Sequence, residues 1–251
     1  MADLSEAAAA YMRAWATREW LDCAENLPVV PQTIDEVYTI HDLLREHPLA
    51  ASIGGHGGWK LGGIGAMGEK CICAPLFRKF MLEAPNPTFA ASDVQLHTVE
   101  AEVGFEMGSD IEPRDAAYSQ DEVLLAVKFF FPAIECCGRR TSAALCDALP
   151  VAGKLADSLL AGGVIVGPKV ARESVDSAAL DSCQTSLCVN AETVATGSPS
   201  EVPCAAPLAA LTWLANHLSR RGITLRKGRA CRLGARERAV SCATCCCRCM
   251  V

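Results

Sequence analysis

Three glutamates have the spacing that most directly indicates chemistry in this chain of 251 residues. Glu100 and Glu102 stand two positions apart in an alternating apolar stretch, and Glu135 follows a run of aromatic and aliphatic residues. A strand sends residues i and i+2 to the same face, so we expect Glu100 and Glu102 to be neighbours. Two carboxylates about 6 Å apart repel each other by about 2–3 kcal/mol at an effective dielectric of about 20. A hard divalent cation reverses that repulsion, because ligand sets made only of oxygen suit magnesium, calcium or manganese.

A half-buried strand with a solvated side is the alternative explanation for Glu100, Glu102 and Glu106. Taken alone, this strand favours the solvated interpretation over a metal site by about two to one. Glu135 shifts the balance, because it directly follows the apolar run 129–134 and precedes two cysteines. A buried carboxylate needs a partner or a metal. The three glutamates together therefore favour a buried acidic site.

Lys60 is a further candidate, because it lies between Trp59 and Leu61 in a glycine-dense stretch. A lysine in an apolar strand can take part in acid–base chemistry or bind a substrate anion. The alternative is a surface lysine with its stem on apolar neighbours, which Lys60 by itself favours. Residues 63–68 match G-x-G-x-x-G, but Pro75 breaks any following helix, so a dinucleotide site is not expected.

The composition bounds the class of protein. A hydrophobic content of 51% and a charged content of 21% are typical of a globular chain with one large or two small domains. The net charge is −6 and basic residues do not interleave with aromatic ones, so we expect no nucleic-acid partner. No apolar run of about 18 residues is present, so we expect no membrane span. The early acids Asp3 and Glu6 disfavour a signal or transit peptide, so we expect a cytoplasmic protein.

Fifteen cysteines invite a disulfide interpretation, which their placement disfavours. Nine are scattered through the body beside apolar residues, as buried free thiols are in a reducing cytosol. The other six lie in the last 21 residues, where the stretch 229–251 carries five arginines and one glutamate. The cluster 242–249 could hold zinc, but a structural zinc site needs a second knuckle, so an unstructured tail is favoured by about three to one.

The elements that must position these residues can be outlined from periodicity and capping signals. A helix is expected over 3–25, and a second one begins after Thr33, with Glu36 as its capping-box partner. A second capping box, at Ser119, opens a helix that ends near Lys128. Strands and a late helix complete the outline: one or two strands over 94–107, a short strand with Glu135, a strand over 162–166, a hairpin over 187–196 and a helix from 207 to 222.

Taken in order, these segments resemble the 2-keto-4-pentenoate hydratase group of the fumarylacetoacetate hydrolase superfamily, from about Val30 to Gly228. Gly58-Trp59-Lys60-Leu61-Gly62 is similar to the family's G-x-K-[VL]-G, and Pro75-Leu76-Phe77 to the segment that follows. The remaining matches are Val99-Glu100-Ala101-Glu102 to E-x-E, Pro132-Ala133-Ile134-Glu135 to P-A-[LI]-E, Ala156-Asp157 with Gly162 to A-D-x(4)-G, and Thr196-Gly197, Pro207-Leu208 and Trp213-Leu214-Ala215-Asn216 to the last hairpin and helix.

The resemblance implies an α+β fold: a mixed β-roll or sandwich of the fumarylacetoacetate hydrolase C-terminal-domain type, with flanking helices. It divides the chain into a helical N-terminal arm (1–50), a hydratase-like catalytic domain shortened at its C-terminal end (51–228) and a divergent Cys/Arg-rich tail (229–251), expected to be disordered.

The resemblance also implies a site. It assigns Mg²⁺ or Mn²⁺ to Glu100, Glu102 and Glu135, catalysis to Lys60, and substrate binding to three further residues, Gly62, Leu76 and Asp157. The implied activity is the addition of water to a short unsaturated 2-oxo or 2-hydroxydienoic acid such as 2-oxopent-4-enoate, in the catabolism of aromatic compounds. The implied partner is that small acid, and a homo-oligomer is left open.

Two departures from the family pattern keep other functions open. An acid expected before Leu76 is replaced by the stretch Ile72-Cys73-Ala74, and a polar residue expected in the A-D-x(4)-G turn is replaced by Leu159 or Leu160. Both losses affect water activation, so decarboxylation of a 2-oxo acid is an alternative. The tail after Gly228 does not follow the family pattern, which suggests an altered reading frame or alternative terminus. A catalytically impaired paralogue that serves as a binding or oligomer partner is the third possibility.

Overall fold

The computed structural model describes residues 3–64, 69–85, 87–88, 90–96, 98–176, 179–180, 183–198, 206–234 and 247–250. Residues 65–68 of the glycine motif and most of the cysteine cluster 242–249 lie outside these ranges, so the predictions on them stay untested. Within the described part, no helix combines the length and the apolar character that a bilayer crossing requires.

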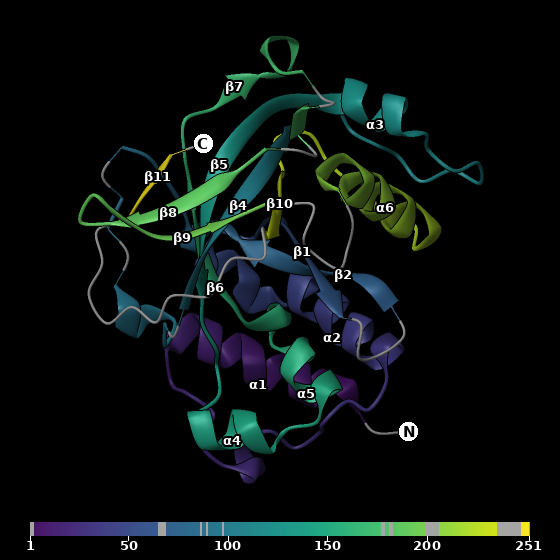
Figure 1. The fold of residues 1–251 in the computed structure, drawn as a ribbon. Coiled ribbons are helices and arrows are strands. Elements are labelled where there is room, and N and C mark those ends of the chain that lie inside the picture. Colours follow the sequence, from purple (N-terminus) through teal and green to yellow (C-terminus); the bar gives the residue numbers. More distant parts are fainter. Residues whose placement is uncertain are drawn as a thin grey trace.

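The N-terminal arm consists of two capped helices. Helix α1 (Leu4–Thr17) begins where the Asp3 side chain accepts a hydrogen bond from the Ser5 amide, and it ends at Arg18, which has a left-handed φ of 65°. It is therefore shorter than the predicted 3–25. Helix α2 (Ile34–Glu46) has the predicted capping box of Thr33 and Glu36. Buried residues of both helices belong to one hydrophobic cluster with Phe77 and Phe80. Figure 1 shows the two helices in the lower half of the view.

An eight-stranded mixed sheet forms the body, in the order β2-β1-β10-β4-β5-β6-β3, with β7 paired to β5. The β1–β10 and β3–β6 pairs are parallel, and the other pairs are antiparallel. The strands are β1 (His56–Ile64), β2 (Glu69–Phe77), β3 (Met81–Glu83), β4 (Thr98–Met107), β5 (Val127–Cys137), β6 (Ala161–Val166), β7 (Val170–Ala171) and β10 (Ala230–Gly234). Strands β2 and β6 are far apart in this order yet contact each other, so the sheet curls into a roll.

The remaining elements cover the roll. A smaller sheet has the order β11-β8-β9. Figure 1 places α3 and α6 on one side of the sheet and α4 and α5 near the N-terminal helices. The bounds are β8 (Thr185–Val189), β9 (Glu192–Gly197), β11 (Cys247–Met250), α3 (Gln120–Ala126), α4 (Ala143–Ala148), α5 (Val151–Ala156) and α6 (Pro207–Arg220). Short 3-10 segments lie at Ala24–Asn26, Pro48–Ile53, Arg78–Phe80, Ala91–Asp93, Ser158–Leu160 and Arg172–Ser174. Helix α3 begins with the predicted Ser119 capping box.

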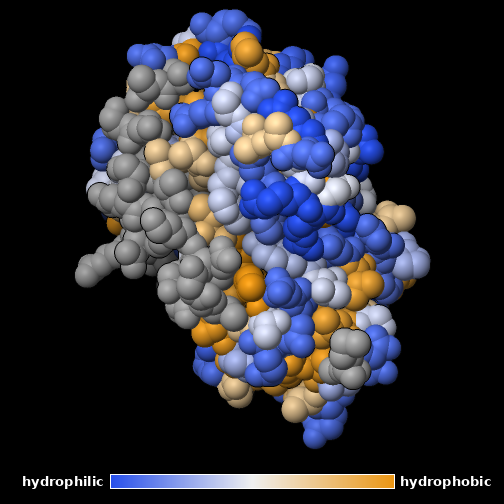
Figure 2. Space-filling model, turned by 90° about the vertical axis from the view of Figure 1, so that its right-hand side faces the viewer, coloured by the Kyte–Doolittle hydropathy of each residue, from blue (hydrophilic) through white to orange (hydrophobic). Residues whose placement is uncertain are grey.

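Strand β4 is largely buried on both faces, so the solvated-strand interpretation does not hold for Glu102, whereas Glu100 and Glu106 are partly exposed. Val99 and Ala101 pack against Leu187 of β8, and Phe105 packs in the cluster that includes α6. On the other face, the Glu102 side chain has no exposed surface. The face of the molecule seen in Figure 2 mixes hydrophilic side chains with small groups of hydrophobic ones.

The tail differs from its expected disorder where the structure describes it. Residues 230–234 form β10, inserted between β1 and β4, and residues 247–250 form β11. In β10, Cys231 faces the hydrophobic core and Arg232 faces the acidic side chains of β4 and β5. This alternation of an apolar and a charged side chain is typical of a strand. The charge of Arg232 is neutralised by glutamates more than 90 positions away in the chain, so the composition of the tail alone cannot predict it.

Eight of the described cysteines are free thiols, and six of these eight are buried, as predicted for the body. Cys71 is an exception, because it forms a disulfide bond.

Candidate active site

Strand pairing brings the predicted acidic residues to one face of the sheet. Glu100 of β4 stands directly opposite Glu135 of β5, and Glu102 lies two positions further along β4. On the neighbouring strands, Lys60 of β1 is paired with Arg232 of β10. Since paired residues share a face, five charged side chains point into the interior of the roll.

Lys60 is held between the acidic group and a backbone carbonyl. Its Nζ donates to Glu135 Oε1 at 2.5 Å and to the Leu159 carbonyl oxygen at 3.0 Å. Its side chain is 12% exposed, so the surface interpretation does not apply. Burial acts to lower the pKa of Lys60, but the charge of Glu135 outweighs it and the pKa is raised. Lys60 is therefore an ammonium group, suited to donating hydrogen bonds.

The carbonyl that Lys60 contacts lies in a strained turn. Ser158, Leu159 and Leu160 have φ values of 46°, 55° and 58° in succession, which residues other than glycine rarely adopt. Each such residue costs of order 1–2 kcal/mol. The turn is held at its two ends, because Leu160 N donates to Asp157 O at 2.7 Å and Gly138 N donates to Leu160 O at 2.8 Å.

Arg232 bridges two of the glutamates. Its Nη1 lies 2.5 Å from Glu102 Oε2 and 2.7 Å from Glu135 Oε2, and its Nη2 donates to Glu135 Oε1 at 2.9 Å. Only 1% of the Arg232 side chain is exposed. Burial raises the pKa of Glu102. Burial acts in the same direction on Glu135, but Arg232 and Lys60 outweigh it and hold the pKa of Glu135 below its ordinary value.

Glu100, Glu135 and Cys137 form the group that could hold a metal. One ligand atom from each lies within 4.8 Å of the others, which suits a single divalent ion. Burial and the charge of Glu135 raise the pKa of Glu100, so a cation here would relieve a real repulsion. Glu102, the third expected ligand, lies outside this group: Arg232 Nη1 contacts its Oε2, and its Oε1 is buried without a hydrogen-bond partner among the described residues.

The three expected substrate-binding residues have different surroundings. Gly62 pairs with Ile72 and Leu76 pairs with Gly58, so both share the Lys60 face of their strands. A side chain added at Gly62 would first meet Leu159 and Ile72 at 4.0 Å, which leaves room beside the strained turn.

Asp157 forms a buried ion pair with Arg140. Its Oδ1 accepts from Arg140 Nε and its Oδ2 accepts from the Arg140 amide, both at 2.6 Å, and neither side chain is more than 2% exposed. Both carboxylate oxygens are thereby engaged in fixing the start of the strained turn. The expected contact of Asp157 with substrate stays a prediction.

Three residues of the site were not identified from the sequence: Arg232, Arg140 and Cys137. One argument could have predicted a residue such as Arg232: a group of three glutamates inside the roll, with a single lysine nearby, needs a second cation. Cys137 also follows from the pairing, because it stands opposite Thr98, on the same face as Glu100.

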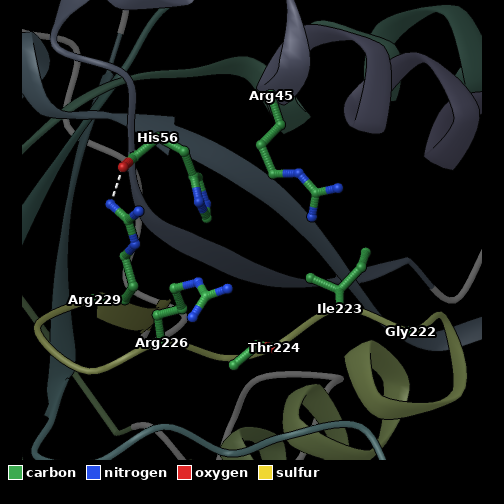
Figure 3. Close-up of a pocket in the computed structure, with 7 residues that line it drawn as sticks. All are labelled: Arg45, His56, Gly222, Ile223, Thr224, Arg226 and Arg229. Carbon is green, nitrogen blue, oxygen red and sulfur yellow. Dashed lines mark hydrogen bonds between the residues drawn. The ribbon is translucent and has the colours of Figure 1, made fainter.

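A hollow with a basic lining lies elsewhere in the described structure. A cavity of about 350 Å³ is lined by Arg45, His56, Gly222, Ile223, Thr224, Arg226 and Arg229. Figure 3 shows Arg45 projecting from α2, and Arg229 donating to the His56 carbonyl oxygen. Burial, together with the like charges of Arg78 and Arg226, lowers the pKa of Arg229. None of the predicted site residues lines this basic cavity, so it is distinct from the acidic group.

Comparison with known proteins finds partial similarity in sequence. No family model matches the chain. A 2-keto-4-pentenoate hydratase from Paraburkholderia xenovorans (strain LB400) and 2-keto-4-pentenoate hydratase 3 from Pseudomonas putida are each 31% identical to it over 140 residues. The match covers 55% of this chain and 48% of each relative, so the chain spans about half the length of the curated relatives it matches.

Similarity in structure extends over nearly the whole chain. The 4-oxalocrotonate decarboxylase from Pseudomonas putida G7, complexed with magnesium and adipate, has a TM-score of 0.78 at 20% identity, over 96% of this chain and 89% of that one. A fumarylacetoacetate hydrolase family protein from Yersinia pestis CO92 has a TM-score of 0.54 at 15% identity, over 78% and 87%. The predicted fold class is thereby confirmed; at these identities the structures show the fold alone.

Proposed function

Because this chain has the fold of the fumarylacetoacetate hydrolase superfamily, as its sequence indicated, we propose that it is a divalent-metal-dependent lyase acting on a short unsaturated 2-oxo acid. Addition of water to an acid such as 2-oxopent-4-enoate is the first candidate reaction, because the sequence matches are to hydratases. The structure of the decarboxylase with a related fold contains magnesium. The proposed function requires a divalent ion and does not depend on which one. A cytoplasmic location and a small-acid substrate belong to the same proposal.

The observation that carries this proposal is the juxtaposition of Lys60, Glu135 and Glu100 inside the roll. Glu100 and Glu135 would hold the ion, with Cys137 beside them. A bound divalent ion would polarise the 2-oxo oxygen and stabilise negative charge as it develops there.

The chain's own residues supply orientation and a fixed positive charge. Lys60 already has two acceptors, Glu135 and the Leu159 carbonyl oxygen, which aim its ammonium group along the inner face of the sheet. From there it can donate a hydrogen bond to a substrate carboxylate or enolate oxygen. The surrounding strands exclude water, which strengthens that interaction relative to one at the surface.

Decarboxylation is the second candidate, favoured by the two positions where the family's polar residues are missing. The thiol of Cys73 is buried, and burial raises its pKa to about 12, so it is a poor base for activating water. Leu159 supplies only an apolar side chain to the turn. Loss of carbon dioxide needs no activated water: the bond to the carboxylate carbon breaks, and its electron pair becomes an enolate that is then protonated.

A substrate panel tests the proposal and separates the two reactions. The full chain is incubated with 2-oxo and 2-hydroxydienoic acids, with added divalent metal or with chelator. Loss of dienol absorbance without gas release indicates hydration, and carbon dioxide release indicates decarboxylation. We expect Glu100→Gln to reduce metal-dependent turnover at least about tenfold, since it removes one charged ligand. Glu106→Gln, on the same strand but paired with Lys169, is the matched control and should keep full activity. No turnover of any acid, with or without metal, would reject the proposal.

A further inference from the structure

We infer that Arg232 is a built-in cation that takes the place of a metal ion between Glu102 and Glu135. The metal site of this chain is consequently displaced along the strands to Glu100, Glu135 and Cys137. There the thiol makes the site select a thiophilic ion such as cobalt or zinc over magnesium. This inference deepens the proposed function and rests on it in one respect, because it concerns the ion of the same site.

The first step is the position of the guanidinium group. It contacts both carboxylates at 2.5–2.9 Å, and it approaches them from the adjacent strand of the sheet. Two carboxylates that converge on one cation form the arrangement in which a divalent ion would otherwise sit. A fixed guanidinium cannot lose its charge, so an ion placed between Glu102 and Glu135 would have to expel Arg232 or endure its repulsion.

The second step is the balance of charge. Glu100, Glu102 and Glu135 carry up to three negative charges, and Lys60 with Arg232 carries two positive ones. The buried group is therefore already close to neutral. Without Arg232, the group would have a larger excess of negative charge, which a divalent ion would neutralise far better. This comparison predicts weak magnesium binding in the wild-type chain.

The third step is the ligand set that remains available. Cys137 stands one same-face position beyond Glu135 on β5, which places its sulfur beside both remaining carboxylates. Coordination would replace the thiol proton, which leaves to solvent, with a metal–sulfur bond. Two carboxylates and one thiolate suit borderline ions such as Zn²⁺ or Co²⁺, whereas Mg²⁺ prefers oxygen ligands alone.

A titration of the full wild-type chain with Mg²⁺ and Co²⁺ tests the inference without relying on activity. Calorimetry should show Co²⁺ binding at least about tenfold more tightly than Mg²⁺. Bound cobalt should give a sulfur-to-cobalt charge-transfer absorption band. The band should disappear in Cys137→Ser and persist in Cys136→Ser, because Cys136 is buried on the opposite face of the same strand.

A second pair of variants tests Arg232 itself. Arg232→Met keeps the length of the side chain and removes its charge, and it should bind Mg²⁺ at least about tenfold more tightly than wild type. Arg221→Met is the matched control, because Arg221 also pairs with a carboxylate, that of Asp42, but lies outside the acidic group, and Mg²⁺ affinity should not change. Should Arg232→Met fail to fold, the wild-type titration and the cysteine variants decide the inference by themselves.

The outcomes separate this inference from the proposed function. Tight Mg²⁺ binding by wild type, or cobalt binding without the sulfur band, would overturn the inference and leave the lyase proposal standing. Failure of every ion to bind both wild type and Arg232→Met would overturn the inference and also remove the metal from the proposed function. The sulfur band together with no turnover of any 2-oxo acid would support the inference and reject the lyase proposal.

Discussion

Glu135 is the residue on which the other charged groups of the site converge. It accepts hydrogen bonds from both Lys60 and Arg232, and it stands opposite Glu100. Its side chain has no exposed surface. A carboxylate so placed neutralises two buried cations at once, so its charge has a structural role besides the one proposed for it in metal binding.

Glu135→Gln should lower the free energy of unfolding by about 3–5 kcal/mol, the usual cost of breaking a buried ion pair from one side. Urea unfolding followed by circular dichroism would measure it. Glu106→Gln removes a half-buried carboxylate that pairs with a lysine near the surface, and should cost no more than about 1 kcal/mol. Equal losses in the two variants would contradict the assigned role of Glu135.

Sequence reasoning singled out Lys60, Glu100 and Glu135, because a short motif surrounds each of them, and the structure places these three side chains together. It missed Arg232, since a residue's electrostatic partners depend on strand pairing and not on its neighbours in the chain. It also missed the pairing of Asp157 with Arg140, for the same reason. Motif matching identifies residue types, and the partner of each side chain emerges only from the tertiary structure.

At the scale of elements, the turn Ser158–Leu160 connects the site to the N-terminal arm. Asp157, at its start, binds Arg140, and the Arg140 guanidinium lies 3.9 Å from the centroid of the Trp15 ring in α1. The N-terminal arm is therefore packed against the rest of the chain, because Trp15 of α1 contacts Arg140, the partner of Asp157. The boundary expected at residue 50 marks a change of secondary structure within one packed unit.

Ser158→Gly should stabilise the protein by about 1 kcal/mol. Ser158 has a left-handed backbone, and its buried hydroxyl lacks a hydrogen-bond partner among the described residues, so glycine removes two unfavourable features. The larger entropy of glycine in the unfolded state offsets part of the gain. Chemical denaturation would measure the difference. Ser158→Ala removes the hydroxyl and retains the Cβ atom, so it should gain less; a loss of stability in the glycine variant would refute the assigned strain.

The chain truncated after Gly228 should fail to unfold cooperatively. Strand β10 pairs with both β1 and β4, so its removal leaves two open strand edges and deprives Glu102 and Glu135 of Arg232. Thermal unfolding with dye binding would report the exposed core. Removal of residues 235–251 alone retains β10 and is the comparison; a sharp transition in the shorter chain would show that β10 is dispensable.

At the scale of the whole molecule, one buried histidine and two half-buried ones make stability depend on pH. Burial lowers the pKa of His41 in α2 and of His217 in α6 to about 4, and burial with nearby arginines lowers that of His56 in β1 further. In each case the folded state binds protons less readily than the unfolded state. Their contribution to stability is complete above about pH 6.5 and falls as the pH drops toward about 4.

The free energy of unfolding should therefore decline between about pH 6.5 and 4, and His41 alone should contribute roughly 3 kcal/mol of that decline. His41→Gln removes this titration and can still donate to the Leu155 carbonyl oxygen, as His41 Nε2 is placed to do at 3.0 Å. Denaturant unfolding of both proteins across this range would test it. Parallel pH profiles for the variant and the wild type would contradict the prediction.

The fold class could be predicted from the sequence, because the short motifs occur in the same order as in a known family. The capping boxes at Thr33 and Ser119 formed as predicted, because their interactions are local. The strand character of 230–234 was not accessible, since it depends on pairing with segments at both ends of the roll.

The pairing of β1 with β10 also bears on how the protein is made. Arg232 contacts Glu102 across 130 positions of the chain, and Lys60 lies still earlier. During synthesis, β1 and β4 are made well before β10, which lies between them in the sheet. The edges of β1 and β4 therefore stay unpaired until β10 has been synthesised. Contacts of such long range slow folding, so nascent chains have an extended period of dependence on chaperones.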